Sequence, residues 1–188
     1  MDYYDSEENV KAYLAMTDGY DGADLIAVLE RYLPEGASVL ELGMGPGKDL
    51  DLLRAAYTVT GSDTSQVFLD RYRKKHPDAD VLLLDARHFG TDRSFDCIYS
   101  NKVLHHLTRD ELAISFGRQR AVLNDAGLVL HSFWYGTGQE TRHGLRFTYY
   151  TEATLREVWG EGFEVLALER YQEIEEGDSL YILLRKTL

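Results

Sequence analysis

Apolar and polar positions along the chain predict short strands that alternate with longer helical segments. Strands are expected at residues 39–42, 57–61, 81–84, 95–100 and 128–133. Ser65 can cap one helix, and Thr108 with Glu111 forms a capping box at the start of another. Strands that alternate with helices predict an α/β fold with a mainly parallel sheet, covered on both faces.

The two ends of the chain depart from this alternation. The first thirty-odd residues look helical, with one apolar face that contains Leu25, Ile26, Val28, Leu29 and Tyr32. Near the other end, Thr151 can cap a short helix. The runs 163–168 and 180–184 then flank a polar turn without an intervening helix. We expect them to form an antiparallel hairpin at the edge of the sheet.

Composition and charge exclude several classes of protein. The chain has 188 residues, which suits one domain, and 44% are hydrophobic. No apolar run reaches the roughly 20 residues that span a bilayer, and the acidic start does not resemble a secretory signal. Cys97 is the only cysteine and the histidines are scattered, so we expect no metal site and a cytoplasmic location. The net charge of −12 argues against nucleic acid as a partner.

A glycine-rich segment follows the first expected strand of the sheet. Gly43, Gly45 and Gly47 let the backbone turn tightly and let a ligand approach closely, and the following helix would direct free amide groups at an anion. A phosphate-binding P-loop needs Ser or Thr after Lys48, but Asp49 stands there. A dinucleotide loop would have its third glycine at position 48. A small carboxylate remains a suitable ligand, and a plain tight turn is the alternative.

Acidic residues end the next two expected strands. Asp63, followed by Thr64, stands at the place where a carboxylate can accept from both ribose hydroxyls. This indicates an adenosine ligand but does not separate S-adenosylmethionine from NAD. Asp85 could accept from an adenine amino group while the Ala86 amide donates to the ring. An ordinary surface carboxylate at position 63 and a helix cap at position 85 are the alternatives.

Taken in order, residues 41–47, Asp63, Asp85, Ala86 and residues 95–107 resemble the successive motifs of class I S-adenosylmethionine-dependent methyltransferases. The resemblance covers roughly residues 38–188. It implies a Rossmann-like doubly wound sheet of about seven strands, mostly parallel, with an antiparallel strand in the C-terminal hairpin. It also implies a single domain, 1–188, with a helical cap (1–36), a cofactor-binding core (37–134) and an acceptor-side loop and hairpin (135–188).

The resemblance further implies a set of residues that bind S-adenosylmethionine. Glu41 would lie near the methionine amino group, the three glycines of the loop along the methionine tail, and Asp63 and Thr64 at the ribose. Asp85 and Ala86 would lie at the adenine, and the backbone around Ser100 and Asn101 at the methionine end. Tyr13 resembles the helix residue that folds over the cofactor. Met44, Lys48 and Asp49 depart from the family's usual pattern, and the Met44 side chain should be tolerated because the backbone makes the contacts.

Methyl transfer from a sulfonium needs mainly orientation and the exclusion of water, so a general base is optional. His105 or His106, after the fourth expected strand, could take a proton from the acceptor or could simply pack there.

The segment 131–150 is too long for a plain connection and is typical of a lid or binding loop. Its candidates for contact with a small acceptor are Trp134, Tyr135, Glu140, Arg142 and Arg146.

Three other functions compete with a small-molecule methyltransferase. The glycine spacing and short chain argue against an NAD-dependent oxidoreductase. A nucleic acid methyltransferase often has prolines after its fourth strand, and Ser100–Asn101–Lys102–Val103 has none. An inactive S-adenosylmethionine-binding regulatory module would keep the same binding residues, so the sequence does not exclude it.

Overall fold

The computed structural model describes residues 4, 6–16, 19–142 and 144–187. The helices are α1 (Glu7–Met16), α2 (Ala23–Leu29), α3 (Lys48–Leu53), α4 (Gln66–Lys75), the 3₁₀ turn η2 (Leu104–His106), α5 (Arg109–Val122) and α6 (Glu152–Arg156). The strands are β1 (Ser38–Leu42), β2 (Thr58–Asp63), β3 (Val81–Leu83), β4 (Phe95–Asn101), β5 (Leu123–Trp134), β6 (Gln139–Arg142), β7 (Leu145–Thr148), β8 (Phe163–Tyr171) and β9 (Ser179–Lys186).

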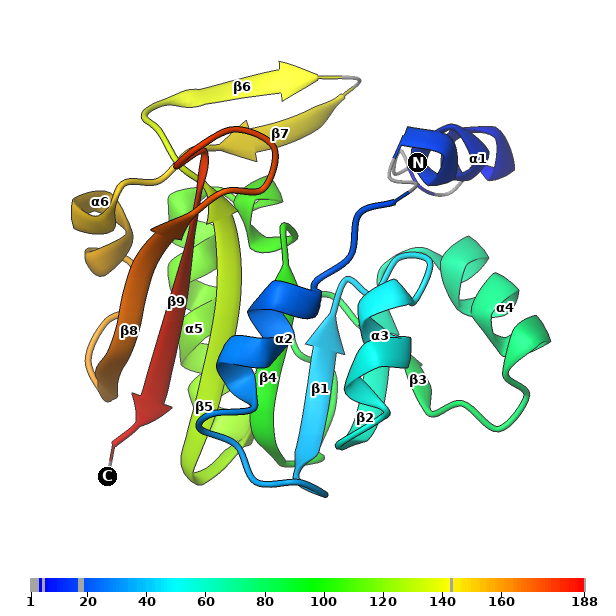
Figure 1. The fold of residues 1–188 in the computed structure, drawn as a ribbon, viewed down its shortest axis with the longest axis horizontal. Helices are drawn as coiled ribbons and strands as arrows, with labels where there is room; N and C mark the ends of the chain where they lie inside the picture. Colours follow the sequence, from blue (N-terminus) through cyan, green and yellow to red (C-terminus); the bar gives the residue numbers. More distant parts are fainter. Residues whose placement is uncertain (1–3, 5, 17–18, 143, 188) are drawn as a thin grey trace.

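One large sheet organises the molecule (Figure 1). In the described part of the chain it has seven strands, in the order β3-β2-β1-β4-β5-β9-β8. Strands β1 to β5 pair in parallel, whereas β9 runs antiparallel to both β5 and β8. The α/β class, the predominantly parallel sheet and the antiparallel C-terminal hairpin are therefore confirmed. The strand order reverses between β1 and β4, and ligands of open α/β sheets bind beyond the carboxyl ends of the strands at such a point.

Helices cover the sheet on both faces. Leu25 and Leu29 of α2 pack with Leu53 of α3 on one face, and Leu112 and Phe116 of α5 pack on the other face with α6. Strands β4 and β5 lie in the middle, so their side chains are buried on both faces. This packing fixes the carboxyl ends of the central strands, where the candidate site lies.

Local side-chain chemistry explains where the helices begin. The Ser65 hydroxyl accepts from the Phe68 amide at the start of α4. Thr108 and Glu111 form the reciprocal capping box of α5. Thr151 caps α6 in the same way with Thr154. All three caps confirm the helix starts expected from the sequence.

The segment after β5 is more regular than a binding loop. Strands β6 and β7 pair as a separate antiparallel hairpin, with Glu140 opposite Phe147 and Thr141 opposite Arg146. Figure 1 shows this hairpin at the end of the main sheet toward which β4 and β5 point. The alternation of polar and apolar residues in β7 suits a strand with one covered face. At the N-terminal end, Tyr32 is exposed rather than part of the apolar face of α2.

None of the helices in the described ranges is both long enough and apolar enough to cross a bilayer.

Candidate active site

The glycine loop connects β1 to α3 in a conformation that requires glycine. Gly43 and Gly45 have φ angles of 64° and 49°, which side-chain-bearing residues rarely adopt. A Cβ atom on Gly43 would stand 2.5 Å from the Val103 side chain, which belongs to the segment after β4. The missing side chain therefore lets two neighbouring strand ends come together at the point where the sheet order reverses.

Asp63 fixes the glycine loop to the end of β2. Its Oδ2 accepts from the Gly45 amide at 2.9 Å, and its Oδ1 accepts from the Ser65 amide at 2.8 Å. The side chain is buried, whereas that of the neighbouring Thr64 is exposed. Both residues lie at the carboxyl edge of the sheet, beside the loop, as the sequence suggested for a ribose-binding pair.

Two further carboxylates, Glu41 and Asp49, are buried near the loop. Glu41 is 3% exposed, and its Oε2 has no hydrogen-bond partner among the described residues. Asp49 accepts hydrogen bonds only from neutral described groups, the Gly22 amide, the Tyr99 hydroxyl and the Asn101 amide. Burial, followed by the charges of Asp49 and Asp63, raises the pKa of Glu41 well above its usual value. The buried carboxylates therefore favour the binding of a positively charged group.

Asp49 was not predicted as a site residue, although its unusual position was noted. Its Oδ1 holds the segment before α2 through the Gly22 amide at 2.7 Å. Its Oδ2 accepts from the Tyr99 hydroxyl at 2.7 Å and from Asn101 at 3.1 Å. The available sequence signal was an acidic residue in the first turn of the helix after the glycines, which complements the helix dipole.

Tyr13 of α1 lies over the glycine loop. Its ring carbon is 3.9 Å from the position of a Cβ on Gly45. Burial, together with the negative charges of Asp63 and Asp49, raises the pKa of Tyr13 to about 12. Tyr13 also packs edge-on against Tyr4 and Phe68, with ring centroids 5.3 and 5.9 Å away. These contacts dock α1 against α4, above the site.

Asp85 and Ala86 follow β3, as expected, but the Asp85 carboxylate is engaged. Arg87 donates through Nε to both carboxylate oxygens, at 2.9 and 3.0 Å, and its backbone amide donates to Oδ1 at 2.8 Å. Ala86 is half-buried against the core. An adenine amino group would have to share the carboxylate with Arg87, and the assignment of Asp85 to the adenine stays a prediction.

Ser100 and Asn101 end β4, and their side chains point to different surroundings. The Ser100 hydroxyl is buried and bonds His131 Nδ1 at 2.9 Å. Asn101 donates to Asp49 and accepts from the Ser132 hydroxyl at 2.6 Å, so it bridges the glycine-loop helix to β5. Only Asn101 brings its side chain to the carboxylate-rich side of the site. A role for the Ser100 backbone stays a prediction.

Lys102, immediately after β4, was also missed. It has a φ of 54°, uncommon for a residue with a side chain. Its ammonium is 4.1 Å from the Trp134 ring centroid and donates to the Phe133 carbonyl at 3.1 Å and the Ser179 hydroxyl. Burial lowers the pKa of Lys102 to about 8, although the charge of Glu173 opposes the shift. Lys102 was within the matched motif, but nothing in the sequence indicated burial.

The two adjacent histidines have different environments. His106 donates from Nδ1 to the Arg146 carbonyl at 2.6 Å and is partly exposed. His105 is buried, and neither of its ring nitrogens has a hydrogen-bond partner among the described residues. Burial and then the charges of His106 and Lys102 lower the pKa of His105 well below its usual value. His105 is therefore neutral at pH 7.

The expected acceptor-side residues do not converge on one pocket. Trp134 lies against Lys102, and the Arg170 guanidinium stacks 3.6 Å from the Tyr135 ring centroid. On the exposed β6 strand, Glu140 pairs with Arg142 at 2.8 Å. Arg146 is exposed, and its Nη1 donates to Gln139 at 3.4 Å. Their roles in binding an acceptor stay predictions.

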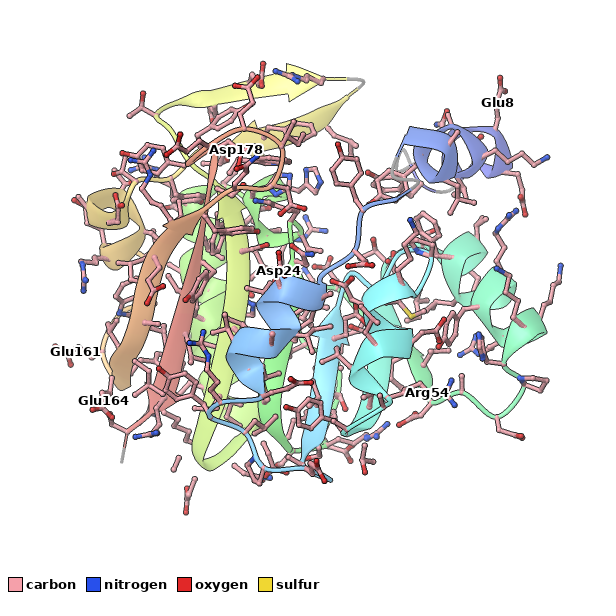
Figure 2. All side chains as sticks on the ribbon, viewed as in Figure 1. Glu8, Asp24, Arg54, Glu161, Glu164 and Asp178 are labelled. Carbon is pink, nitrogen blue, oxygen red and sulfur yellow. The ribbon has the colours of Figure 1, made fainter. Side chains whose placement is uncertain are left out.

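A small acidic cavity opens beside Asn101. It has a volume of about 140 Å³ and lies between the segments 19–25 and 171–173. Its described lining carries the carboxylates of Asp21, Asp24 and Glu173 and no lysine or arginine. Figure 2 labels Asp24 at the start of α2. Together with the buried carboxylates, this lining makes the site suitable for positively charged or amine-bearing small molecules.

The fold and site define a class of Rossmann-like α/β domain, with a glycine loop and acidic strand ends at the switch point of the sheet. Comparison with known proteins is more specific. Residues 39–127 match the family described as a methyltransferase domain. A dTDP-3-amino-3,6-dideoxy-α-D-glucopyranose N,N-dimethyltransferase of Streptomyces fradiae is 32% identical over 120 residues, covering 61% of this chain and 47% of the relative.

Two other similar proteins extend the comparison. A trans-aconitate 2-methyltransferase of Variovorax paradoxus is 35% identical over 86 residues, covering 44% of this chain and 33% of the relative. The solved structure of the 1,6-didemethyltoxoflavin-N1-methyltransferase of Burkholderia thailandensis, which contains S-adenosylhomocysteine, matches with a TM-score of 0.77 at 21% identity. That match covers 95% of this chain and 83% of the other.

Residues 39–127 of the chain are thus similar to methyltransferase domains, in keeping with the resemblance of its motifs to class I S-adenosylmethionine-dependent methyltransferases. The matched regions make up less than half the length of the two curated relatives.

Proposed function

We propose that this protein binds S-adenosylmethionine at the carboxyl edge of β1 and β2 and methylates a small molecule. When bound, the cofactor supplies a methyl group on a positively charged sulfur, which a nucleophile takes by in-line displacement. The protein then has to bind both molecules, orient them and exclude water. Orientation of this kind can contribute up to about 7–11 kcal/mol in favourable cases.

The buried carboxylate of Glu41 is the single observation that carries the proposal. A buried carboxylate oxygen without a hydrogen-bond partner among the described residues, close to further carboxylates, is costly unless a ligand completes it. The methionine part of the cofactor has an ammonium group that would meet this need. Asp49 would add negative charge on the same side without losing its present hydrogen bonds. These residues fit the cofactor.

The remaining cofactor contacts follow from the strand ends. Gly43, Gly45 and Gly47 would leave room along the methionine tail, and Asp63, with Thr64, would accept from the ribose hydroxyls. Because Asp63 is held by two amides, it would meet the ribose without reorganisation. Tyr13 and the ring cluster around it would shield the site from water. Further contacts are proposed from Asp85, Ala86, Ser100 and Asn101.

Support for a small acceptor comes from the relatives and from the charge of the site. The relatives include an amino-sugar N,N-dimethyltransferase and a methyltransferase of trans-aconitate. These names represent amine and carboxylate acceptors. The acidic lining around Asp21, Asp24 and Glu173 favours the amine. On the hairpin side, the proposed contacts with the acceptor are Trp134, Tyr135, Glu140, Arg142 and Arg146. The proposed proton acceptor is His105 or His106.

The proposal is tested with methyl-labelled S-adenosylmethionine and a fixed panel of small amines, phenols and carboxylic acids. We expect labelled product from at least one amine, and loss of that product in Asp63→Ala. Asp125→Ala, at an exposed position, is the matched control and should retain the wild-type rate. Cofactor binding without transfer to any acceptor, together with a stable protein partner, would instead support an inactive binding module.

A further inference from the structure

His105 is a buried imidazole without the partners that such groups normally have. It lies in η2, just beyond the carboxyl end of β4, and is 2% exposed. Neither Nδ1 nor Nε2 has a hydrogen-bond partner among the described residues. Most buried polar side chains are hydrogen-bonded, because a lost partner costs free energy. An apolar side chain would pack here at lower cost, so the imidazole needs another explanation.

The β6–β7 hairpin packs against the His105 ring. Phe147 of β7 stacks on the His105 ring, with centroids 5.1 Å apart and planes inclined by 28°. Two hydrogen bonds hold this strand to the segment around η2. His106 Nδ1 donates to the Arg146 carbonyl at 2.6 Å, and the Thr148 hydroxyl donates to the Leu107 carbonyl at 3.1 Å. The hairpin pairs with no strand of the main sheet in the described part of the chain.

The position of His105 relates it to the proposed cofactor site. Val103, two residues earlier, packs against Gly43 of the glycine loop. Lys102 and His106 are the charged or titratable neighbours that affect His105, and both disfavour its protonated form. The imidazole is therefore neutral and has a nitrogen lone pair. His106 differs from His105 in that it is partly exposed and its Nδ1–H donates to the Arg146 carbonyl.

We propose that His105 contacts the acceptor as its proton acceptor, and that the β6–β7 hairpin moves away from His105 to admit an acceptor with an N–H or O–H nucleophile. The inference rests on the proposed methyl transfer. As the nucleophile reacts, its N–H or O–H bond breaks, the electron pair stays on nitrogen or oxygen, and the proton bonds to the free imidazole nitrogen. The imidazolium then returns the proton to water before the next turnover.

The first experiment compares His105→Leu, close in volume to histidine, with a polar second variant, His105→Gln. We expect a midpoint of thermal unfolding no more than about 2 °C below wild type for His105→Leu, because no hydrogen bond is lost. Affinity for S-adenosylhomocysteine should stay within threefold in both variants. Transfer to the best acceptor of the panel should fall at least about 100-fold in both.

Two results would overturn the inference. A fall of more than about 5 °C in both variants would mean that His105 is part of the core. Transfer within threefold of wild type would mean that it does not take the proton. Failure of the wild-type protein to bind S-adenosylhomocysteine would contradict the proposed function itself, so the two failures are distinguishable.

The second experiment needs no acceptor. Diethylpyrocarbonate modifies exposed neutral imidazoles, and peptide mass spectrometry reports the modification of His105. Thr148→Val removes one hydrogen bond that holds the hairpin. Thr141→Val makes the same substitution on β6, where the Thr141 side chain is exposed. We expect His105 to react at least threefold faster in Thr148→Val than in Thr141→Val. Equal protection in the two variants would contradict the proposed movement of the hairpin.

Discussion

Two buried histidines lie near the same pair of central strands, and their surroundings differ. His131, on β5, bonds the Ser100 hydroxyl at 2.9 Å and the Gln119 side-chain oxygen at 2.7 Å. Gln119 in turn donates to Ser115 at 3.2 Å, so the whole chain of groups is partnered. His105, at the end of β4, has no such partner among the described residues. Both are buried.

This difference separates a histidine that stabilises the fold from one that is available to a ligand. Burial lowers the pKa of both imidazoles, to about 3 for His131. A shifted pKa therefore does not distinguish the two. The hydrogen-bond partners do, because an unpartnered group in the interior is a cost that a ligand can remove.

The largest expected effect on stability comes from His131, the histidine with hydrogen-bond partners. His131→Leu leaves the Ser100 hydroxyl and the Gln119 side-chain oxygen without their buried partner. We expect the free energy of unfolding to fall by about 3 kcal/mol, measured by urea denaturation. The same substitution at His105 serves as the matched control and should cause little or no loss. Equal losses in the free energy of unfolding at both positions would contradict the proposed difference between the two histidines.

Both imidazoles should nevertheless respond to acid in the same way. Because the fold lowers their pKa values, the unfolded chain binds more protons once the pH falls below about 6.5. Stability is complete above that pH and declines as the pH falls toward 3 for His131. Between pH 7 and pH 5 we expect a loss of roughly 2 kcal/mol from His131, and a further loss in the same direction from His105.

Urea denaturation at pH 7 and pH 5 measures this acid response. His105→Leu removes one of the two groups, so its loss of unfolding free energy over this range should be smaller than that of wild type. An identical loss in the variant would mean that His105 already binds a proton in the fold, contrary to its neutral state here.

A smaller effect on stability tests whether the Ser100 hydroxyl stabilises the fold or contacts the cofactor. Ser100→Ala removes one partner of His131 and should lower the free energy of unfolding by about 1 kcal/mol. Affinity for S-adenosylhomocysteine should not change, because the hydroxyl faces the interior. Ser94→Ala, at an exposed position, is the control. A tenfold loss of affinity for S-adenosylhomocysteine with unchanged stability would instead indicate that the Ser100 hydroxyl contacts the cofactor.

The smallest effect concerns a second unpartnered group. The Tyr150 hydroxyl is buried and has no hydrogen-bond partner among the described residues, and burial raises the pKa of Tyr150 to about 12. Tyr150→Phe should leave the free energy of unfolding unchanged or raise it by up to about 1 kcal/mol. Thermal unfolding followed by circular dichroism measures the change. A clear destabilisation would show that the hydroxyl has a partner after all.

The glycine loop and the neighbouring strand ends were largely predictable because their determinants are local in sequence. The alternation of Gly43, Gly45 and Gly47 after an apolar strand predicts a tight loop, and the structure has positive φ angles at all three. Asp63 follows at the end of the next strand, and Ser65 caps the next helix. Parallel pairing of β1 with β2 brings these strand ends to one edge of the sheet.

The proposed acceptor side was less predictable because its determinants are contacts between distant segments. The burial of Lys102 depends on Trp134 and on Ser179, far along the chain. The isolation of His105 depends on Phe147, which the sequence suggested only as part of an irregular loop. Local patterning gives residue types and strand ends, but it does not show which side chains a hairpin will cover.

The most direct test of the account is calorimetric titration of the wild-type protein and Glu41→Gln with S-adenosylmethionine, S-adenosylhomocysteine and NADH. The account predicts that the first two ligands bind to the wild type, that both bind at least about tenfold more weakly to the variant, and that NADH gives no heat of binding. Binding of NADH with no response to the other two would contradict it and would favour an oxidoreductase.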